Sequence, residues 1–207
     1  MVVDIAGGTF SANEAASITD VPLKEVHRII DRGLLGSAVE VVDGGRVLQG
    51  IGLLALKMAH ETRAVLTLAG RRRLVGFLLR QTEAKAARTS CVSVDLASMR
   101  DDVQSGLAQL RRARNEVVSD PAVLAGTPCI RGTRIPAHDI AEMLASGDSV
   151  ESILKDFSWL SASQIELASV YARAYPRRGR PRREPLHQRK QVALSEAVFD
   201  DLPAAGS

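Results

Sequence analysis

The chain contains 207 residues, enough for one large or two small domains, and its 45% hydrophobic content is typical of a globular protein with a net charge of +3. Two cysteines build neither a disulfide framework nor a thiolate metal cluster, which predicts a reducing compartment. The longest apolar run, residues 51–56, is far shorter than the roughly 18 residues of a membrane helix, and the first residues lack the basic region of a signal peptide. We therefore expect a cytoplasmic protein that does not enter a membrane.

The charges are unevenly distributed along the chain. Residues 1–176 carry equal numbers of basic and acidic side chains. Residues 177–190 hold seven basic side chains and one acidic one, whereas residues 191–207 hold three acidic side chains and no basic one. Prolines between the arginines favour a flexible tail over residues 177–207, and its basic segment is the main electrostatic feature of the sequence.

The first predicted elements form a helix-turn-helix. Ser11 and Glu14 match the S-x-x-E pattern of a capping box, which predicts a helix from about residue 12. Pro22 suits the first turn of a second helix, which we expect to end at Gly33. An apolar stripe on this second helix lies opposite a polar face, as in a helix that enters a DNA groove. The stripe comprises Val26, Ile29 and Ile30, and the polar face comprises Lys24, His27 and Arg28.

A β-hairpin is predicted next. Asp43-Gly44 separates two apolar segments, residues 39–42 and 46–48, and glycine readily adopts the positive φ angle of a tight turn. We interpret the hairpin as a wing beside the helix-turn-helix, with Arg46 as a further DNA-binding residue. Two helices, a short strand and a connecting helix should follow, at residues 53–62, 71–88, 92–96 and 101–114.

A second helical unit is predicted from residue 115. Two short strands, at residues 116–118 and 129–135, should precede three helices that form a second helix-turn-helix-like core. We expect Trp159 in the core of this unit. The predicted helix boundaries are Pro136 and Gly147 for the first helix, an Asp148–Glu151 cap for the second, and a Ser161–Gln164 cap for the third, which runs to about Tyr175.

Two segments resemble known families. Residues 10–35, which end in Gly33-Leu34-Leu35, are similar to the MerR-like winged helix-turn-helix pattern. Residues 126–136 read G-T-P-C-I-R-G-T-R-I-P and resemble the G-x-P-x-I-x-G-T-R-I-P signature of a small bacterial domain family found among VapB-type antitoxins. The second similarity extends from Asp120 to Tyr175.

The resemblances imply a mainly α fold with small β elements and tandem helix-turn-helix domains. The implied parts are a MerR-like winged domain at residues 1–90, a connecting strand and helix at 91–114, a second helix-turn-helix-like domain with the GTRIP hairpin at 115–176, and a disordered, toxin-binding tail at 177–207. They also imply an antitoxin of a type II toxin–antitoxin system. Such a chain binds and silences a VapC-type PIN-domain ribonuclease and, as a dimer or toxin complex, binds operator DNA to repress its own operon. Common VapB chains are shorter and carry a ribbon-helix-helix or AbrB-like DNA-binding domain, from which this chain differs.

The tail has the chemistry of an inhibitor segment. Arginines pair bidentately with the clustered carboxylates of a magnesium-dependent ribonuclease, and apolar residues spaced by four predict a short helix that forms in a partner's groove. The alternatives are that the tail binds DNA phosphates or only keeps the protein soluble. The predicted toxin-binding residues are Arg177, Arg178, Arg180, Arg182, Arg183, Arg189, Leu194, Val198, Phe199 and Leu202.

The charge and the motifs of the sequence limit the other functions open to the chain. The second unit is net acidic, which favours dimerisation or partner docking over base recognition, while Arg131 and Arg134 bind either phosphate or nearby carboxylates. No phosphate-binding loop, activated nucleophile or metal-ligand spacing is evident, so we expect no catalysis, cofactor or metal. The alternatives are a toxin-independent DNA-binding transcriptional regulator and an adaptor that only mediates assembly.

Overall fold

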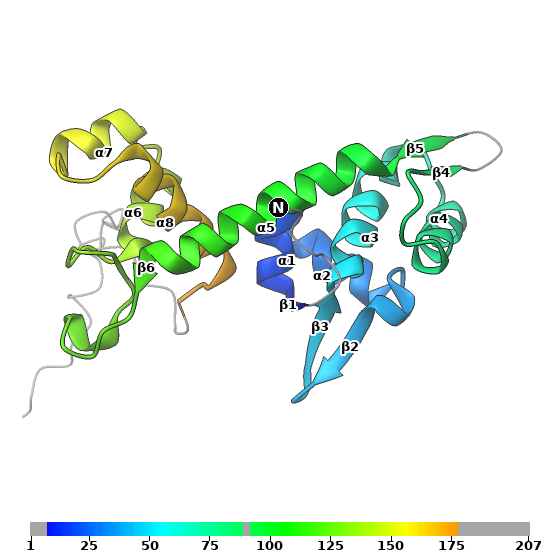
Figure 1. Ribbon diagram of the computed structural model, residues 1–207, viewed down its shortest axis with the longest axis horizontal. Helices are drawn as coiled ribbons and strands as arrows, with labels where there is room; N and C mark the ends of the chain where they lie inside the picture. Colours follow the sequence, from blue (N-terminus) through cyan, green and yellow to red (C-terminus); the bar gives the residue numbers. More distant parts are fainter. Residues whose placement is uncertain (1–7, 89–91, 178–207) are drawn as a thin grey trace, which may run out of the picture. The chain divides into compact units, whose positions relative to one another are not determined.

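The computed structural model describes residues 8–88 and 92–177. This part of the chain is mainly helical with three small antiparallel sheets, which confirms the predicted fold class (Figure 1). Of the tail predicted at residues 177–207, residues 178–207 lie outside the described residues. None of the helices within the described ranges is both long and apolar enough to cross a membrane.

The first two helices form the predicted helix-turn-helix. Helix α1, Ala12–Thr19, begins with the expected capping box, in which the Glu14 amide donates to Ser11 Oγ at 3.3 Å and the Ser11 amide donates to Glu14 Oε2 at 2.8 Å. Helix α2, Leu23–Asp31, follows Pro22 and buries Val26 and its apolar neighbours. The local pattern predicted both helices because their caps and stripes are encoded within a few residues.

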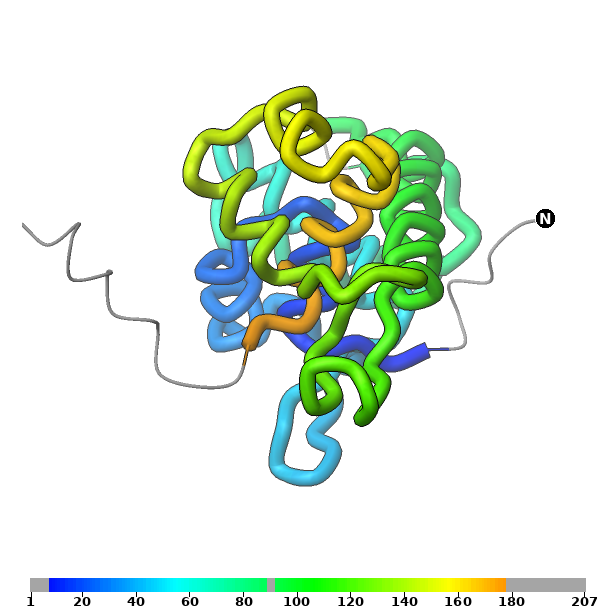
Figure 2. Tube along the Cα trace, turned by 90° about the vertical axis from the view of Figure 1, so that its left-hand side faces the viewer, coloured from blue at the N-terminus to red at the C-terminus, as the bar shows by residue number. Residues whose placement is uncertain are grey.

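A three-stranded sheet carries the wing. Strands β2, Val39–Val42, and β3, Gly45–Gln49, form the predicted hairpin, with φ angles of 49° at Asp43 and 76° at Gly44. Strand β1, Thr9–Ser11, pairs with the other edge of β3. The hairpin projects from the helices in Figure 2.

The middle of the chain departs from the prediction at α4 and in the residues that follow it. The helix expected over residues 71–88 is α4, Leu68–Arg80, and residues 86–88 instead form a strand paired with residues 93–95. The apolar residues at helical spacing end near Leu79. The strand at residues 86–88 forms by pairing with residues beyond the following loop, and such pairing leaves no pattern in the strand's own sequence. The elements in this region are η2, Gly36–Ala38; α3, Gly50–Glu61; η3, Thr62–Ala64; β4, Ala86–Arg88; and β5, Ser93–Asp95.

Helix α5, Leu96–Glu116, is longer than the predicted connecting helix. It begins early because the Asp95 side chain accepts a hydrogen bond from the Ala97 amide at 2.9 Å. Gly106 lies where α5 packs tightly against α1: an added Cβ would be 2.0 Å from the Ile18 carbonyl oxygen. Only glycine fits this contact.

The second unit contains three helices and a short antiparallel pair of strands, but the strand expected over residues 129–135 is shortened to Cys129–Ile130 because residues 131–134 form turns and bends. The predicted Asp148 cap is wrong: Ser149 Oγ accepts from the Ser152 amide at 3.1 Å, while the Asp148 amide binds the Met143 carbonyl and completes the end of the preceding helix. The predicted capping box of Ser161 and Gln164 is confirmed. The elements are β6, Val117–Val118; η4, Leu124–Gly126; β7, Cys129–Ile130; α6, Ala137–Ala145; α7, Val150–Asp156; and α8, Ala162–Ala174.

Helix α8 contributes to two hydrophobic cores. Its Leu167, Val170 and Ala174 pack in the larger core with α1, α3 and α5, whereas Ile165 and Ala168 pack in a smaller core with α6. The expectation that Trp159 is a core residue is wrong, because its side chain is 66% exposed and the neighbouring Leu160 is buried instead.

Candidate nucleic-acid interface

Helix α2 presents the predicted polar face to solvent. Lys24, His27 and Arg28 are exposed, and Val26, Ile29 and Ile30 on the opposite side are buried. Burial of the apolar stripe fixes the rotation of the helix about its axis, so the polar face points outward. Within the described ranges, Lys24 and His27 have no hydrogen bond or ion pair, whereas Arg28 pairs with Glu25 at 2.6 Å.

The wing is linked to α2 by an ion pair. Arg46 Nη1 on β3 lies 2.7 Å from Asp31 Oδ1 at the end of α2. Val41 is 72% exposed on the adjacent strand. The four predicted DNA-binding residues therefore lie on α2 and on the strand tied to it, although Arg28 and Arg46 each have a carboxylate partner.

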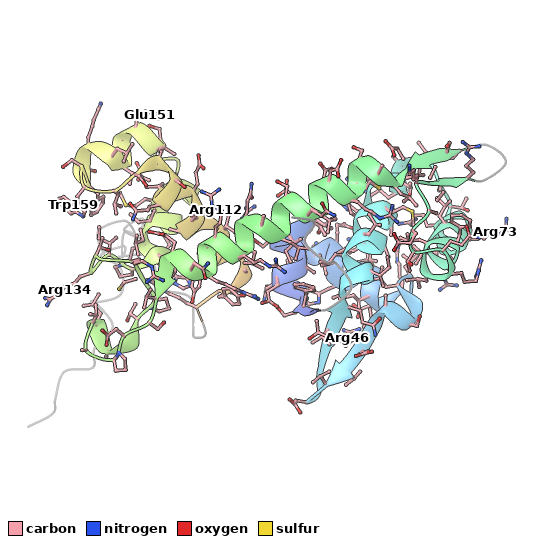
Figure 3. The ribbon with its side chains drawn as sticks, viewed as in Figure 1. Arg46, Arg73, Arg112, Arg134, Glu151 and Trp159 are labelled. Atoms are coloured by element: carbon pink, nitrogen blue, oxygen red, sulfur yellow. The ribbon has the colours of Figure 1, made fainter. Side chains whose placement is uncertain are left out.

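Two further cations were missed from the sequence. Arg72 on α4 donates to the Arg32 carbonyl oxygen at 2.9 Å, just beyond the last turn of α2, and Arg73 beside it is exposed (Figure 3). The run Arg71-Arg72-Arg73 was visible in the sequence, but its proximity to α2 depends on long-range packing. Arg71 has a structural role instead, since its guanidinium donates to the Ala59 carbonyl at 3.4 Å.

The two signature arginines have different environments. Arg131 donates to the Asn115 carbonyl oxygen at the end of α5, with Nε at 2.9 Å, so it binds backbone. Arg134 is exposed and has no hydrogen bond or ion pair with the part of the chain that the structure describes; Figure 3 shows it pointing away from the helices.

Arg177 is the only predicted toxin-binding residue among those described. Its guanidinium contacts Asp139 at 2.5 Å and Glu142 at 3.1 Å on α6, so it is already paired within the chain. The remaining predicted toxin-binding residues lie outside the described residues: Arg178, Arg180, Arg182, Arg183, Arg189, Leu194, Val198, Phe199 and Leu202.

A polar cluster joins the helix-turn-helix to the end of α8. Tyr175 Oη donates to Glu14 Oε1 at 2.7 Å, and Arg114 Nη2 lies 2.5 Å from the same oxygen. Burial opposes ionisation of Glu14, but hydrogen bonds from Tyr175, Ser11 and Arg114 outweigh it and lower the pKa of this carboxyl group. Burial and the bond to Glu14 raise the pKa of Tyr175 to about 12. The cluster therefore favours a carboxylate beside a neutral phenol.

The described residues contain no group of three or more histidine, cysteine, aspartate or glutamate side chains placed to hold a metal ion. Their charged groups instead form the solvent-facing cations of α2 and α4 and the ion pairs described above.

The fold and this surface define a winged helix-turn-helix protein with a second helical unit. Residues 117–172 match the family model described as "Protein of unknown function (DUF433)". The chain is 36% identical over 211 residues to the uncharacterized protein y4eO of Sinorhizobium fredii (strain NBRC 101917 / NGR234), an alignment that covers 93% of this chain and 86% of the relative. The chain therefore belongs to the same family as this rhizobial protein. No solved structure matches it.

Proposed function

We propose that this protein is a DNA-binding transcriptional regulator in which α2 is the recognition helix. The observation that carries the proposal is the orientation of α2, which buries Val26, Ile29 and Ile30 and leaves Lys24 and His27 exposed without partners in the described chain. A helix held in this way offers donors to base edges in a major groove.

The surroundings of α2 suit a negatively charged duplex. Arg46 lies on the wing, Arg72 on α4 contacts the Arg32 carbonyl just beyond the end of α2, and Arg73, the next residue of α4, is exposed. Contacts of these cations with phosphate orient a protein on DNA without reading sequence. The Glu25 and Asp31 partners of Arg28 and Arg46 limit unspecific binding, because phosphate must compete with a carboxylate.

The test is selection of binding sites from random duplex DNA with the full-length protein, followed by titration of the selected site. We expect Lys24→Ala with His27→Ala to relax base preference, and Arg73→Ala to weaken binding to all sequences and to reduce the salt slope by about one. Lys155→Ala on α7 is the matched control and should leave both properties unchanged. Failure of the wild-type protein to bind duplex DNA at low salt would contradict the proposal and favour an assembly adaptor.

Within this class, the proposed role is that of a VapB-type antitoxin. The support is the resemblance of residues 126–136 to the signature found among such antitoxins and the arginine-rich sequence of residues 177–190. In this role the tail neutralises a VapC-type PIN-domain ribonuclease in the cytoplasm, and the dimer, alone or with toxin, represses the shared operon.

The antitoxin role is tested by pull-down from the native host with the full-length chain and with residues 1–177. Arg177 stays in the shorter form because it pairs with Asp139 and Glu142. We expect a small ribonuclease to be retained by the full-length chain only, and its RNA cleavage to be inhibited. A third, full-length form has glutamine in place of the arginines at 178–189. It removes the positive charge of the tail but keeps its length, so it shows which of the two is needed to retain the ribonuclease. If no ribonuclease is retained while DNA binding persists, the protein is a toxin-independent regulator.

A further inference from the structure

A hollow of about 510 Å³ lies beside the turn between β7 and α6. Its apolar wall includes Val118, Val123 and Ile130, and three charged residues, Asp120, Arg131 and Arg134, also line it. We call this surface the signature hollow, because Ile130 and Arg134 belong to the G-T-P-C-I-R-G-T-R-I-P segment.

Asp120 and Arg134 of the signature hollow are not paired with each other. Asp120 Oδ1 accepts a hydrogen bond from the Ala122 amide at 2.9 Å, and no ion pair within the described chain involves either Asp120 or Arg134. Arg131, in contrast, is bound to the Asn115 carbonyl and completes the fold locally. The hollow therefore holds one carboxylate and two guanidinium groups, of which Asp120 and Arg134 have no ion pair within the described chain and can meet an external partner.

Apolar side chains are exposed beside the hollow. Val118 is 37% exposed and Leu124 is 51% exposed. Leu124 and Ala125 have positive φ angles of 46° and 53°, and Thr127 Oγ1 donates to the Leu124 carbonyl at 2.7 Å, which holds this turn. Left-handed backbone at two successive non-glycine residues costs free energy, yet the turn presents Leu124 to solvent. The surface thus combines exposed apolar groups with charges of both signs.

We propose that the occupant of the signature hollow is a second copy of this chain, related to the first by a two-fold axis. In a two-fold interface the same patch is used by both copies. When one residue of the first copy contacts a second residue of the other copy, the symmetry-related contact therefore forms as well. Asp120 of each copy then pairs with Arg134 of the other, while Val118 and Leu124 are covered. A patch that carries charges of both signs suits such reciprocal pairing, whereas two patches of a single sign would repel each other.

This inference deepens the proposed function and rests on it only for the requirement of a dimer. Two recognition helices on one duplex must come from two chains, because the described residues contain one α2. The surface assigned here lies on the second unit, so the DNA-binding face of α2 is not used for pairing.

The experiment measures the dimer dissociation constant of the full-length protein by sedimentation equilibrium in the absence of DNA. We expect Asp120→Arg and Arg134→Asp each to weaken the dimer by about tenfold or more, since each reversal occurs twice in the interface. The double variant D120R/R134D reverses both partners and should restore much of the lost affinity. Lys155→Asp on α7 makes the same change of charge as R134D outside the hollow and should have little effect.

Leu124→Asn provides a second, independent variant. Asparagine tolerates the left-handed conformation, so we expect an unchanged or higher melting temperature together with a weaker dimer. A chain that stays monomeric up to its solubility limit, a dimer that neither reversal weakens, or a double variant as weak as the single ones would overturn the proposal. Because no DNA is present, these outcomes are separate from the failure of α2 to bind a duplex.

Discussion

At the scale of single residues, Gly106 shows how one side chain controls a helix contact. The added Cβ of alanine would be 2.0 Å from the Ile18 carbonyl oxygen, which belongs to the backbone of α1 and cannot rotate away. We expect Gly106→Ala to lower the free energy of unfolding by about 3 kcal/mol or more. Gly76→Ala on α4 is the control, because the nearest atom to its Cβ is the flexible Arg80 guanidinium at 3.4 Å. It should be neutral or stabilising by up to about 1 kcal/mol in urea unfolding. Equal effects of the two substitutions would contradict the close contact.

Glu14 gives the fold a dependence on pH. Its pKa is lowered from the ordinary value of 4.5, so the stability that it contributes is present above that value and is lost as the pH falls through the folded-state pKa. Glu14→Gln should therefore be less stable than the wild type near neutral pH, and the difference should shrink as the pH falls below about 4.5. Thermal unfolding of both proteins, measured from neutral pH to below about pH 4.5, checks this prediction. A constant difference between them at all pH values would contradict an ionised Glu14.

At the scale of elements, the start of α7 distinguishes two neighbouring side chains. Ser149 caps the helix, whereas the amide of Asp148 completes the end of α6 and its side chain caps nothing in the described chain. We expect Ser149→Ala to cost about 1 kcal/mol of unfolding free energy and Asp148→Ala to cost much less. Urea denaturation of the two variants tests the assignment. A larger loss of unfolding free energy in Asp148→Ala than in Ser149→Ala would support the Asp148 cap that the sequence predicted.

Elements with local signals were predictable, and elements that depend on distant partners were not. The capping boxes at Ser11 and Ser161 and the turn at Asp43-Gly44 are each encoded within a few residues, and all three are confirmed. Strand β4 depends on pairing with β5, so its residues were predicted as helix. For the candidate site, the polar face of α2 followed from its apolar stripe. The proximity of Arg72 to Arg32 required tertiary packing between α4 and the end of α2.

At the scale of the whole molecule, the two hydrophobic cores should unfold together. Helix α8 contributes to both, and the bonds from Tyr175 and Arg114 to Glu14 join its end to α1. We expect Leu54→Ala in the larger core to cost about 2–5 kcal/mol and to lower hydrogen-exchange protection of the α6 amides by a similar free energy. Unchanged protection of α6 in this variant would show that the smaller core unfolds independently.

The sharing of α8 also bears on how such a chain can evolve. The family match covers residues 117–172, yet Leu167 and Val170 inside it pack against helices that the match does not include. Recombination that moved this segment into another protein would expose these apolar side chains unless the recipient supplied surfaces like those of α1 and α5. The two halves are therefore inherited most readily as one piece, in keeping with an alignment to the rhizobial relative that spans 93% of this chain.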